Sequence, residues 1–148
     1  MSYTATIMAE RYPYGRRYKY PHMKPNDVAI WERFIDANPT AYDFVEYDRG
    51  IGDIPAFMEQ TSSPQGQAMR ELYRLKIDVV GYKKNAIDLI EVKHEAGASS
   101  IGQILGYVTL FVRDVQPTLP VKPVLLTNIL RPNMEFLTQT QGVKLIVV

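Results

Sequence analysis

The chain has 148 residues, of which 46% are hydrophobic and 22% charged. This length and composition match one globular domain and exclude a disordered or collagen-like chain. The absence of cysteine excludes a disulfide framework, thiolate zinc sites and cysteine catalysis. Two histidines, His22 and His94, are too few for a multi-histidine metal cage, so a metal site would use oxygen ligands, which favours magnesium or manganese.

No apolar run approaches the roughly 20 residues that a membrane span requires, so we expect no membrane association. The N-terminal residues lack the apolar core of a secretory signal. We therefore expect a cytoplasmic protein.

The net charge of +1 hides an uneven distribution. Residues 1–25 carry five basic residues and one acidic residue, a net +4, so the remainder of the chain sums to −3. The same segment holds half of the ten tyrosines. Cations contact phosphates and aromatic rings stack on bases, so this composition is typical of a nucleic-acid-binding arm; the alternative is a free or strand-swapped terminus whose charge aids solubility. The cationic side chains that we expect to contact nucleic acid are Arg11, Arg16, Arg17 and Lys19 of this arm, and Lys83 and Lys84 of a later turn.

The first predicted element is an amphipathic helix between Asn26 and Pro39. Asn26 is the expected N-cap and Asp27 suits the positive end of the helix. Apolar residues from Val28 to Ile35 gather on one face. Glu32 falls at the border of that face, where it either points inward along the edge of a core or is solvated.

The remaining elements are predicted from periodicity and from turn residues. A strand is expected at 42–47, followed by a long irregular stretch at 48–64 and a short helix at 67–73. Two strong β segments, 75–82 and 86–93, are joined by a turn at 83–85 as a hairpin. Then follow a helix at 99–113 capped by Ser99 or Ser100, a strand at 121–127, a helix at 132–141 ended by Gly142, and a strand at 143–148. The order α-β-β-β-α-β-α-β predicts an α/β fold with helices around a mixed central sheet.

The hairpin register brings charged residues together. Counting inward from the turn pairs Asp78 with Glu91, and directly opposed residues share a face with Cβ atoms about 5 Å apart. Lys93 lies two residues further along the same face. Two opposed carboxylates repel each other unless a positive charge offsets them. Lys93 would do so in a structural ion cluster, and a divalent cation would do so better; the register favours the cation.

The pattern of Asp78, twelve intervening residues and then Glu91-Val92-Lys93, placed in a hairpin followed by a helix and two further strands, resembles the PD-(D/E)xK nuclease superfamily. Ile77 stands where the proline of that name would be. Gln103 and Tyr107, four residues apart on the next helix, resemble the Gln-x-x-x-Tyr motif of RecB-like members. Gly102 and Gly106 beside them are poor helix formers, which indicates close packing against the sheet or a ligand.

The resemblance implies a restriction-endonuclease-like core over residues 26–148, preceded by the arm at 1–25. By analogy, Asp78, Glu91 and the backbone carbonyl of Val92 would bind Mg²⁺ or Mn²⁺, and Glu32 would complete the coordination shell as in Holliday-junction-resolvase-like members. Glu46, Asp48 and Asp53 are rival candidates for that last place. The residues expected to act in catalysis are Asp78, Glu91, Lys93, Gln103 and Tyr107.

The function expected from this resemblance is metal-dependent phosphodiester hydrolysis, in DNA intermediates of recombination, repair or replication, by a nucleoid-associated homodimer. Three alternatives differ in class: a catalytically inactive nucleic-acid-binding protein with the same fold, an interaction protein whose tyrosine-rich arm binds another chain, and a subunit of a larger repair or restriction assembly. Residues 1–25 and 48–66 are the segments expected to select the substrate.

Overall fold

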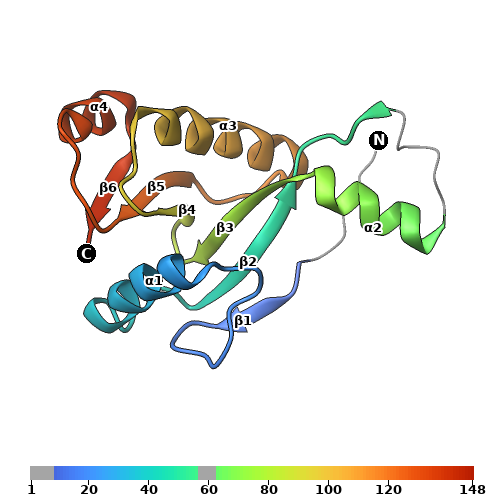
Figure 1. Ribbon diagram of the computed structural model, residues 1–148, viewed down its shortest axis with the longest axis horizontal. Coiled ribbons are helices and arrows are strands. Elements are labelled where there is room, and N and C mark those ends of the chain that lie inside the picture. Colours follow the sequence, from blue (N-terminus) through green and yellow to red (C-terminus); the bar gives the residue numbers. More distant parts are fainter. Residues whose placement is uncertain (1–8, 57–62) are drawn as a thin grey trace.

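The computed structural model describes residues 9–56 and 63–148. Within them the chain is an α/β protein with a six-stranded mixed sheet and four helices (Figure 1). The strands are β1 (Arg11–Pro13), β2 (Phe44–Ile51), β3 (Leu75–Tyr82), β4 (Ile87–Lys93), β5 (Val121–Thr127) and β6 (Lys144–Val147). The helices are α1 (Pro25–Ala37), α2 (Pro64–Tyr73), α3 (Ala98–Val115) and α4 (Met134–Gln141).

The six strands follow one another across the sheet in chain order. The pairs from β1 to β4 are antiparallel, whereas β4, β5 and β6 are parallel. This change follows from the connections: a short turn joins β3 to β4, while α3 and α4 carry the chain back across the sheet before β5 and β6. Helix α1 covers one face of the sheet, and α3 and α4 cover the other (Figure 1). The predicted α-β-β-β-α-β-α-β order is present, the short helix expected before the hairpin is α2, and β1 is additional.

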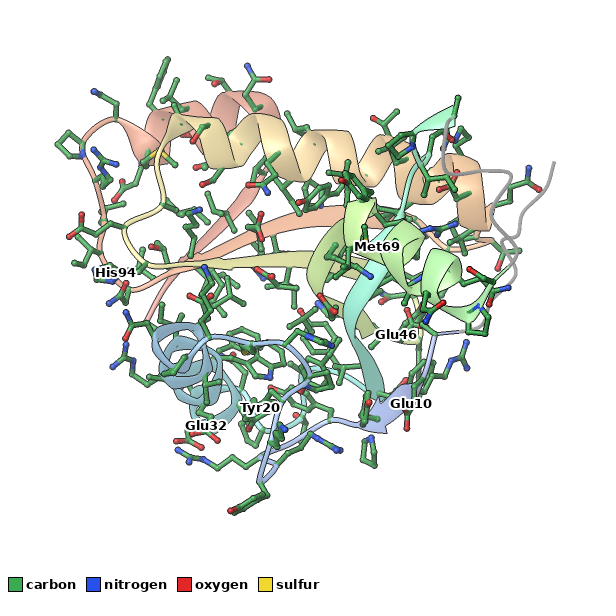
Figure 2. All side chains as sticks on the ribbon, turned by 45° about the vertical axis from the view of Figure 1, so that its right-hand side comes forward. Glu10, Tyr20, Glu32, Glu46, Met69 and His94 are labelled. Carbon is green, nitrogen blue, oxygen red and sulfur yellow. The ribbon has the colours of Figure 1, made fainter. Side chains whose placement is uncertain are left out.

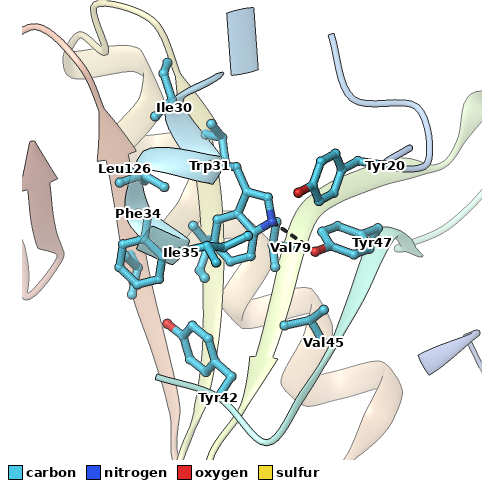
Figure 3. Close-up of a cluster of buried hydrophobic side chains, with 13 residues drawn as sticks. Tyr20, Ile30, Trp31, Phe34, Ile35, Tyr42, Val45, Tyr47, Val79 and Leu126 are labelled. Carbon is cyan, nitrogen blue, oxygen red and sulfur yellow. Dashed lines mark hydrogen bonds between the residues drawn. The ribbon is translucent and has the colours of Figure 1, made fainter. Parts of the chain in front are cut away.

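The core on the α1 side is built around Trp31, which is fully buried (Figure 3). Its ring stacks on Phe34, and its indole N–H donates to the Tyr47 hydroxyl at 2.9 Å. This bond satisfies the polar atom of the indole, which allows the whole ring to be buried. Val79, Val92 and the other inward-facing strand residues of that face complete the cluster.

The core on the opposite face lies beneath α3. Ile104, Tyr107 and Phe111 project from successive turns of the helix onto Leu89 and Leu125 of the sheet. The apolar stripe predicted for this helix is therefore its buried face. The two cores hold β3 and β4 between them, so the hairpin is fixed from both sides.

The described part of the basic arm, residues 9–25, packs onto the domain. Strand β1 extends the sheet by pairing with β2, and Tyr20 is buried in the α1-side core with Tyr12 and Tyr14 packed against it. These three rings contact other aromatic side chains instead of being free to stack on bases. Tyr18 is fully exposed, and Tyr3 lies outside the described residues. Residues 9–25 therefore pack onto the same sheet and core as the rest of the described chain.

Element boundaries differ from the prediction mainly at helix N-termini. Helix α1 begins at Pro25 with Lys24 as N-cap, so Asn26 is not the cap, because proline is pre-organised for the first helical position. Helix α3 begins after Gly97, which places Ser99 and Ser100 inside its first turn. Helix α4 begins two residues later than predicted and ends, as predicted, at Gly142.

Helix α2 begins at Pro64, three residues earlier than predicted, because the Ser63 hydroxyl accepts the Gly66 N–H at 3.0 Å and caps the turn. The preceding irregular stretch is shorter than expected, since β2 continues to Ile51. Part of that stretch, residues 57–62, lies outside the described residues. Among the described helices, none has the length and apolar character that crossing a membrane requires.

Candidate functional site

The hairpin register is the predicted one, but the strands separate at the point where the carboxylates meet. Tyr82 pairs with Ile87 and the ladder continues to Val79 and Ile90, where it stops. Asp78 and Glu91 occupy the next position. Here the Asp78 carboxylate, through Oδ2, accepts the backbone N–H of Val92 at 2.9 Å. The side chain of Asp78 thus replaces the missing rung and holds the two strands together across the opening.

Strand β2 is interrupted at the same level. Tyr47 pairs with Val79 and Arg49 with Ile77, but the position between them, where Asp48 would pair with Asp78, is skipped. Asp48 has a positive φ of 52°, a conformation that bends the strand locally. The backbone around Asp78 is therefore released from its ladder on both sides, which frees its side chain to reach β4.

Glu91 is buried, with 5% of its surface exposed, and its Oε2 has no hydrogen-bond donor in the described part of the chain. Burial, together with the neighbouring Asp78 carboxylate, raises the pKa of Glu91 to about 10. Such an arrangement is costly for the ionised form because both desolvation and like charge oppose it. The ionised form of Glu91 is therefore disfavoured unless a positive charge offsets it.

Two charged residues flank this pair. The Lys93 ammonium, at the exposed end of β4, lowers the pKa of Glu91 by its positive charge. Asp27, in the first turn of α1, raises the pKa of Glu91 by its negative charge. The pKa of Asp27 is itself raised, first by burial and then by Asp78, while Lys24, Lys93 and His94 oppose that rise. The N-terminus of α1 thus lies close to the open end of the hairpin.

Helix α3 closes the site from the other side. Gln103 donates from Nε2 to the Tyr107 hydroxyl at 2.7 Å, which links the two residues predicted to share a helix face. Burial raises the pKa of Tyr107, and the charges of Glu91 and Asp78 also raise it. The Gln103 and Tyr107 pair and the two carboxylates therefore belong to one cluster, built from β3, β4 and α3.

The donor set suits a hard cation. Two carboxylates supply oxygen ligands of the kind that Mg²⁺ and Mn²⁺ prefer, and an orphaned carboxylate oxygen at Glu91 is directed to no protein donor among the described residues. Residues 9–56 and 63–148 contain no group of three or more His, Asp or Glu side chains arranged around a common metal position. The remaining ligands of a cation here would be main-chain oxygen, for which Val92 is adjacent, and water.

The structure does not bring Glu32 to this cluster. Glu32 accepts hydrogen bonds from Arg16 at 3.1 Å and from the Tyr20 hydroxyl at 2.8 Å, on the outer side of α1 (Figure 2). The α1 carboxylate whose charge acts on Asp78 and Glu91 is Asp27, one and a half turns earlier. The expected role of Glu32 as a ligand stays a prediction that this arrangement does not support, because its carboxylate is bonded to Arg16 and Tyr20 of the folded arm.

The rival acidic residues also have other partners. Glu46 is buried and accepts hydrogen bonds from Tyr82 and Arg49. Asp53 pairs with Arg113 at 3.0 Å. Asp48 lies 3.8 Å from the His22 imidazole. None of these three carboxylates is placed with Asp78 and Glu91 in a metal-binding group.

Most of the predicted nucleic-acid-binding cations are engaged within the described chain. Arg16 pairs with Asp36 and Glu32, Arg11 lies over the Phe44 ring at 4.4 Å, and Arg17 lies over the Tyr12 ring at 4.2 Å. Lys83 pairs with Asp88 at 3.2 Å. Lys83 and Lys84 are in the turn, about 17 Å along β4 from Glu91. Lys19 and Lys84 are exposed.

One residue of the site was not predicted from the sequence. Asp27 was expected only to stabilise the N-terminus of α1, and a helical pattern gives no sign of what lies beyond the helix. His94 directly follows Lys93, and from the sequence it either faces the site entrance or is a surface residue. In the structure it shares a hydrogen bond through Nδ1 with Asn128 at 2.8 Å, beyond the end of β4 (Figure 2).

Comparison with family models, with curated proteins and with solved structures finds no match for this chain. The class that the fold defines is therefore a mixed α/β protein with a six-stranded sheet.

Proposed function

We propose that this protein is a metal-dependent nuclease of the restriction-endonuclease-like fold, which hydrolyses phosphodiester bonds in DNA with Mg²⁺ or Mn²⁺. The observation that carries the proposal is the pair Asp78 and Glu91 at the opened end of the hairpin, with a buried Glu91 oxygen that has no described donor. A fully satisfied structural pair would leave no such atom. The element order and the Glu91-Val92-Lys93 motif support the same assignment by resemblance.

Asp78 and Glu91 would hold the cation, with the main chain of Val92 beside them. A bound Mg²⁺ or Mn²⁺ supplies Lewis-acid activation of water and neutralises negative charge on the attacked phosphate. Val92 donates its N–H to Asp78, so this hydrogen bond fixes the Asp78 carboxylate against β4. Because Asp78 is held by the main chain, it needs no rearrangement to receive a cation.

Lys93 would position a phosphate oxygen and stabilise the charge that develops during hydrolysis. Its ammonium is at the exposed end of β4, next to the carboxylates and open to a substrate. Gln103 would orient a water or a phosphate through its amide, since its Nε2 bond to Tyr107 fixes the rotamer. The negative charge of Asp27 would act on the Asp78 and Glu91 carboxylates.

One observation favours a different function. Burial and the neighbouring Asp78 carboxylate raise the pKa of Glu91, which favours a proton on its carboxyl, close to Asp78, when no cation is present. A stable proton-bridged pair beside Lys93 would be the site of a catalytically inactive protein that keeps the fold and binds nucleic acid or another chain. The two functions differ in whether a divalent cation displaces that proton.

The test is cleavage of labelled single-stranded, duplex, flap and four-way-junction DNA, and of RNA, with Mg²⁺, Mn²⁺ or EDTA. We expect cleavage of at least one DNA with either cation, none with EDTA, and a loss of about a hundredfold or more in Asp78→Asn and in Lys93→Met. Full cleavage by either variant would overturn the assignment of these residues. No cleavage together with no saturable Mn²⁺ binding in calorimetry would favour the inactive protein.

The expected homodimer and larger repair or restriction assembly stay predictions. Light scattering after size-exclusion chromatography, with and without DNA, measures the first directly. A mass of one chain under both conditions would exclude a mechanism that needs two sites for two strands.

A further inference from the structure

The loops that follow β4 and β5 bring two basic residues to the end of the sheet that holds the candidate site. Lys93 is the last residue of β4, and β5 runs parallel beside it and ends at the same level. The two loops are tied together by the hydrogen bond of 2.8 Å between His94 and Asn128. The Arg131 guanidinium lies against Gly97, where a Cβ would be 3.1 Å from its Nη1 atom. Arg131 is therefore held on the Lys93 side of the β3–β4 hairpin.

Helix α1 brings a third basic residue to the same place. Lys24 is the N-cap residue of α1. Burial is the main cause of the raised pKa of Asp27, and the positive charges of Lys24 and Lys93 oppose that rise. Both cations are therefore near Asp27. Because α1 covers one face of the sheet and α3, which begins at Gly97, covers the other, Lys24 and Arg131 lie on opposite sides of Lys93 (Figure 1).

These three cations have no anionic partner in the described residues. Lys24, Lys93 and Arg131 are exposed, and none forms an ion pair within residues 9–56 and 63–148. The neighbouring acidic residues are Asp27 and Glu95, and Glu95 is 3.8 Å from the His94 ring. The cations are thus free to bind an anion from outside the chain.

Two of the cations are placed where they oppose the stability of the protein. Lys24 is at the N-terminus of α1, and Arg131 lies against the N-cap residue of α3. The N-terminus of a helix carries partial positive charge, so a basic side chain is unfavourable there and favourable at the other end. The folded protein by itself gains nothing from a basic residue at either position. An external anion would offset both charges.

We propose that Lys24 and Arg131 contact the phosphates on either side of the scissile phosphate, so that the DNA strand crosses the end of β4 from α1 to the start of α3 with Lys93 at its centre. This inference rests on the proposed function. It adds contacts outside the basic arm, where Arg16 is engaged with Asp36. Ammonium and guanidinium groups bind phosphate oxygens whatever the base, so the contacts set the path of the strand without reading its sequence.

The proposal predicts opposite changes for removed cations and for a removed acid. Lys24→Gln and Arg131→Gln should each weaken DNA binding by about threefold or more, and should lower the slope of log Kd against log salt by about 0.7 for a single strand and about 0.9 for a duplex. The loss should be the same for DNA of different base sequence. Tm should not fall, because an unfavourable charge is removed. Glu95→Gln should strengthen binding, since it removes a charge that repels phosphate.

The measurement is fluorescence anisotropy with a fluorescein-labelled DNA single strand and its duplex over a series of salt concentrations, with Tm measured on the same samples. Ca²⁺ is present as a hard cation with oxygen ligands. Lys122→Gln is the matched control, because Lys122 is exposed, has no ion pair in the described chain and lies at the other end of β5, about 16 Å away. It should keep the Kd and the salt slope of the parent. Steady-state cleavage in Mg²⁺ should show mainly a raised KM in Lys24→Gln and Arg131→Gln.

The outcomes separate this inference from the proposed function. If the parent cleaves DNA and the Lys24 and Arg131 variants keep its Kd and salt slope, the phosphate contacts are refuted while the nuclease stands. An equal loss in Lys122→Gln would show an effect of net charge alone and would also overturn the inference. If the variants lose affinity as expected but the parent cleaves no DNA, the contacts stand and the nuclease is refuted. If the parent neither binds nor cleaves DNA, both are refuted.

Discussion

The two ends of the β3–β4 hairpin each hold a buried acidic residue, and the two residues have opposite surroundings. At the turn end, Asp88 is 4% exposed and accepts the Tyr42 hydroxyl at 2.7 Å while pairing with Lys83 at 3.2 Å. At the open end, Glu91 is as deeply buried but its Oε2 has no donor in the described chain. Burial of a carboxylate is therefore no sign of function by itself. The unmet hydrogen-bonding capacity of Glu91 is what distinguishes a candidate site from a structural pair.

The backbone pairing also differs between the two ends of the β3–β4 hairpin. The ladder between β3 and β4 is continuous from the turn to Val79 and Ile90 and then opens. Near the turn, the close approach of Tyr42 to Gly81 leaves no space for a side chain, since a Cβ there would lie 2.5 Å from the ring. The turn end is thus closed by packing, and at the open end the side chain of Asp78 bonds β3 to β4.

The largest expected effect is on activity. Glu91→Gln should reduce DNA cleavage in Mg²⁺ by about a hundredfold or more, because it removes a charged ligand from the site. Asp88→Ala should leave cleavage per folded molecule unchanged, since its contacts are at the other end of the hairpin. Initial rates of DNA cleavage, corrected for the folded fraction by circular dichroism, measure the activity of both variants. Equal losses in the two variants would abolish the distinction between the ends.

The next effect is on stability at the turn end. Asp88→Ala should lower the free energy of unfolding by about 1–3 kcal/mol, because it leaves the buried Tyr42 hydroxyl without its acceptor. Tyr42→Phe in the same background should recover part of that loss by removing the unpaired hydroxyl. Urea unfolding of the single and double variants measures the coupling. Additive losses would show that the two groups do not interact in solution.

At the open end, the sign of the stability effect should reverse. Glu91→Gln should raise the free energy of unfolding in EDTA at neutral pH by about 1–3 kcal/mol, because a neutral amide avoids the cost of either protonating or desolvating the buried carboxylate and can donate to Asp78. Saturating Mg²⁺ should raise the Tm of the parent and not that of the variant. Thermal unfolding with and without Mg²⁺ is the measurement, and Asp88→Asn is the matched control. A variant that is less stable than the parent in EDTA would mean that Glu91 is a satisfied structural residue.

The smallest effect concerns the pH dependence of stability at Glu46. This buried carboxylate accepts hydrogen bonds from Tyr82 and Arg49. Burial raises the pKa of Glu46, against the opposing effect of Arg49 and Tyr82. A raised pKa in the folded state means that Glu46 contributes most to stability below its ordinary pKa of about 4.5, and that this contribution is lost as pH rises through the folded value. The stability of Glu46→Gln relative to the parent should therefore increase as pH rises above about 4.5. Urea unfolding across that range tests the sign, which a decrease would contradict.

The sequence predicted the elements of the fold because local patterns determine them. The β3 and β5 boundaries agree with the structure at both ends, and the hairpin register followed from counting inward from the turn. The helix faces followed from spacing in the same way. Helix N-termini were less accurate, since Pro25 and Gly97 set them through backbone geometry while Asn26 and Ser99 offered competing cap signals.

The site was only partly accessible to such reasoning. Asp78, Glu91 and Lys93 could be grouped because they are on adjacent strands with a fixed register, and Gln103 with Tyr107 because they are one helical turn apart. The choice between Glu32 and Asp27 depends on how α1 docks and on the Arg16 and Tyr20 contacts of the arm. The arm itself looked free because its charge and tyrosine content resemble those of a nucleic-acid-binding tail.

What the sequence by itself determined was the order of the elements and which residues share a strand or helix face, because a period of two or 3.6 residues is a property of the local backbone. Only the tertiary structure decided which groups are left without a partner: Asp88 satisfied, Glu91 unsatisfied, the arm packed into the sheet, and the glycines of α3 open to solvent. Desolvation and hydrogen bonding depend on neighbours far apart in the chain, and no local period records them.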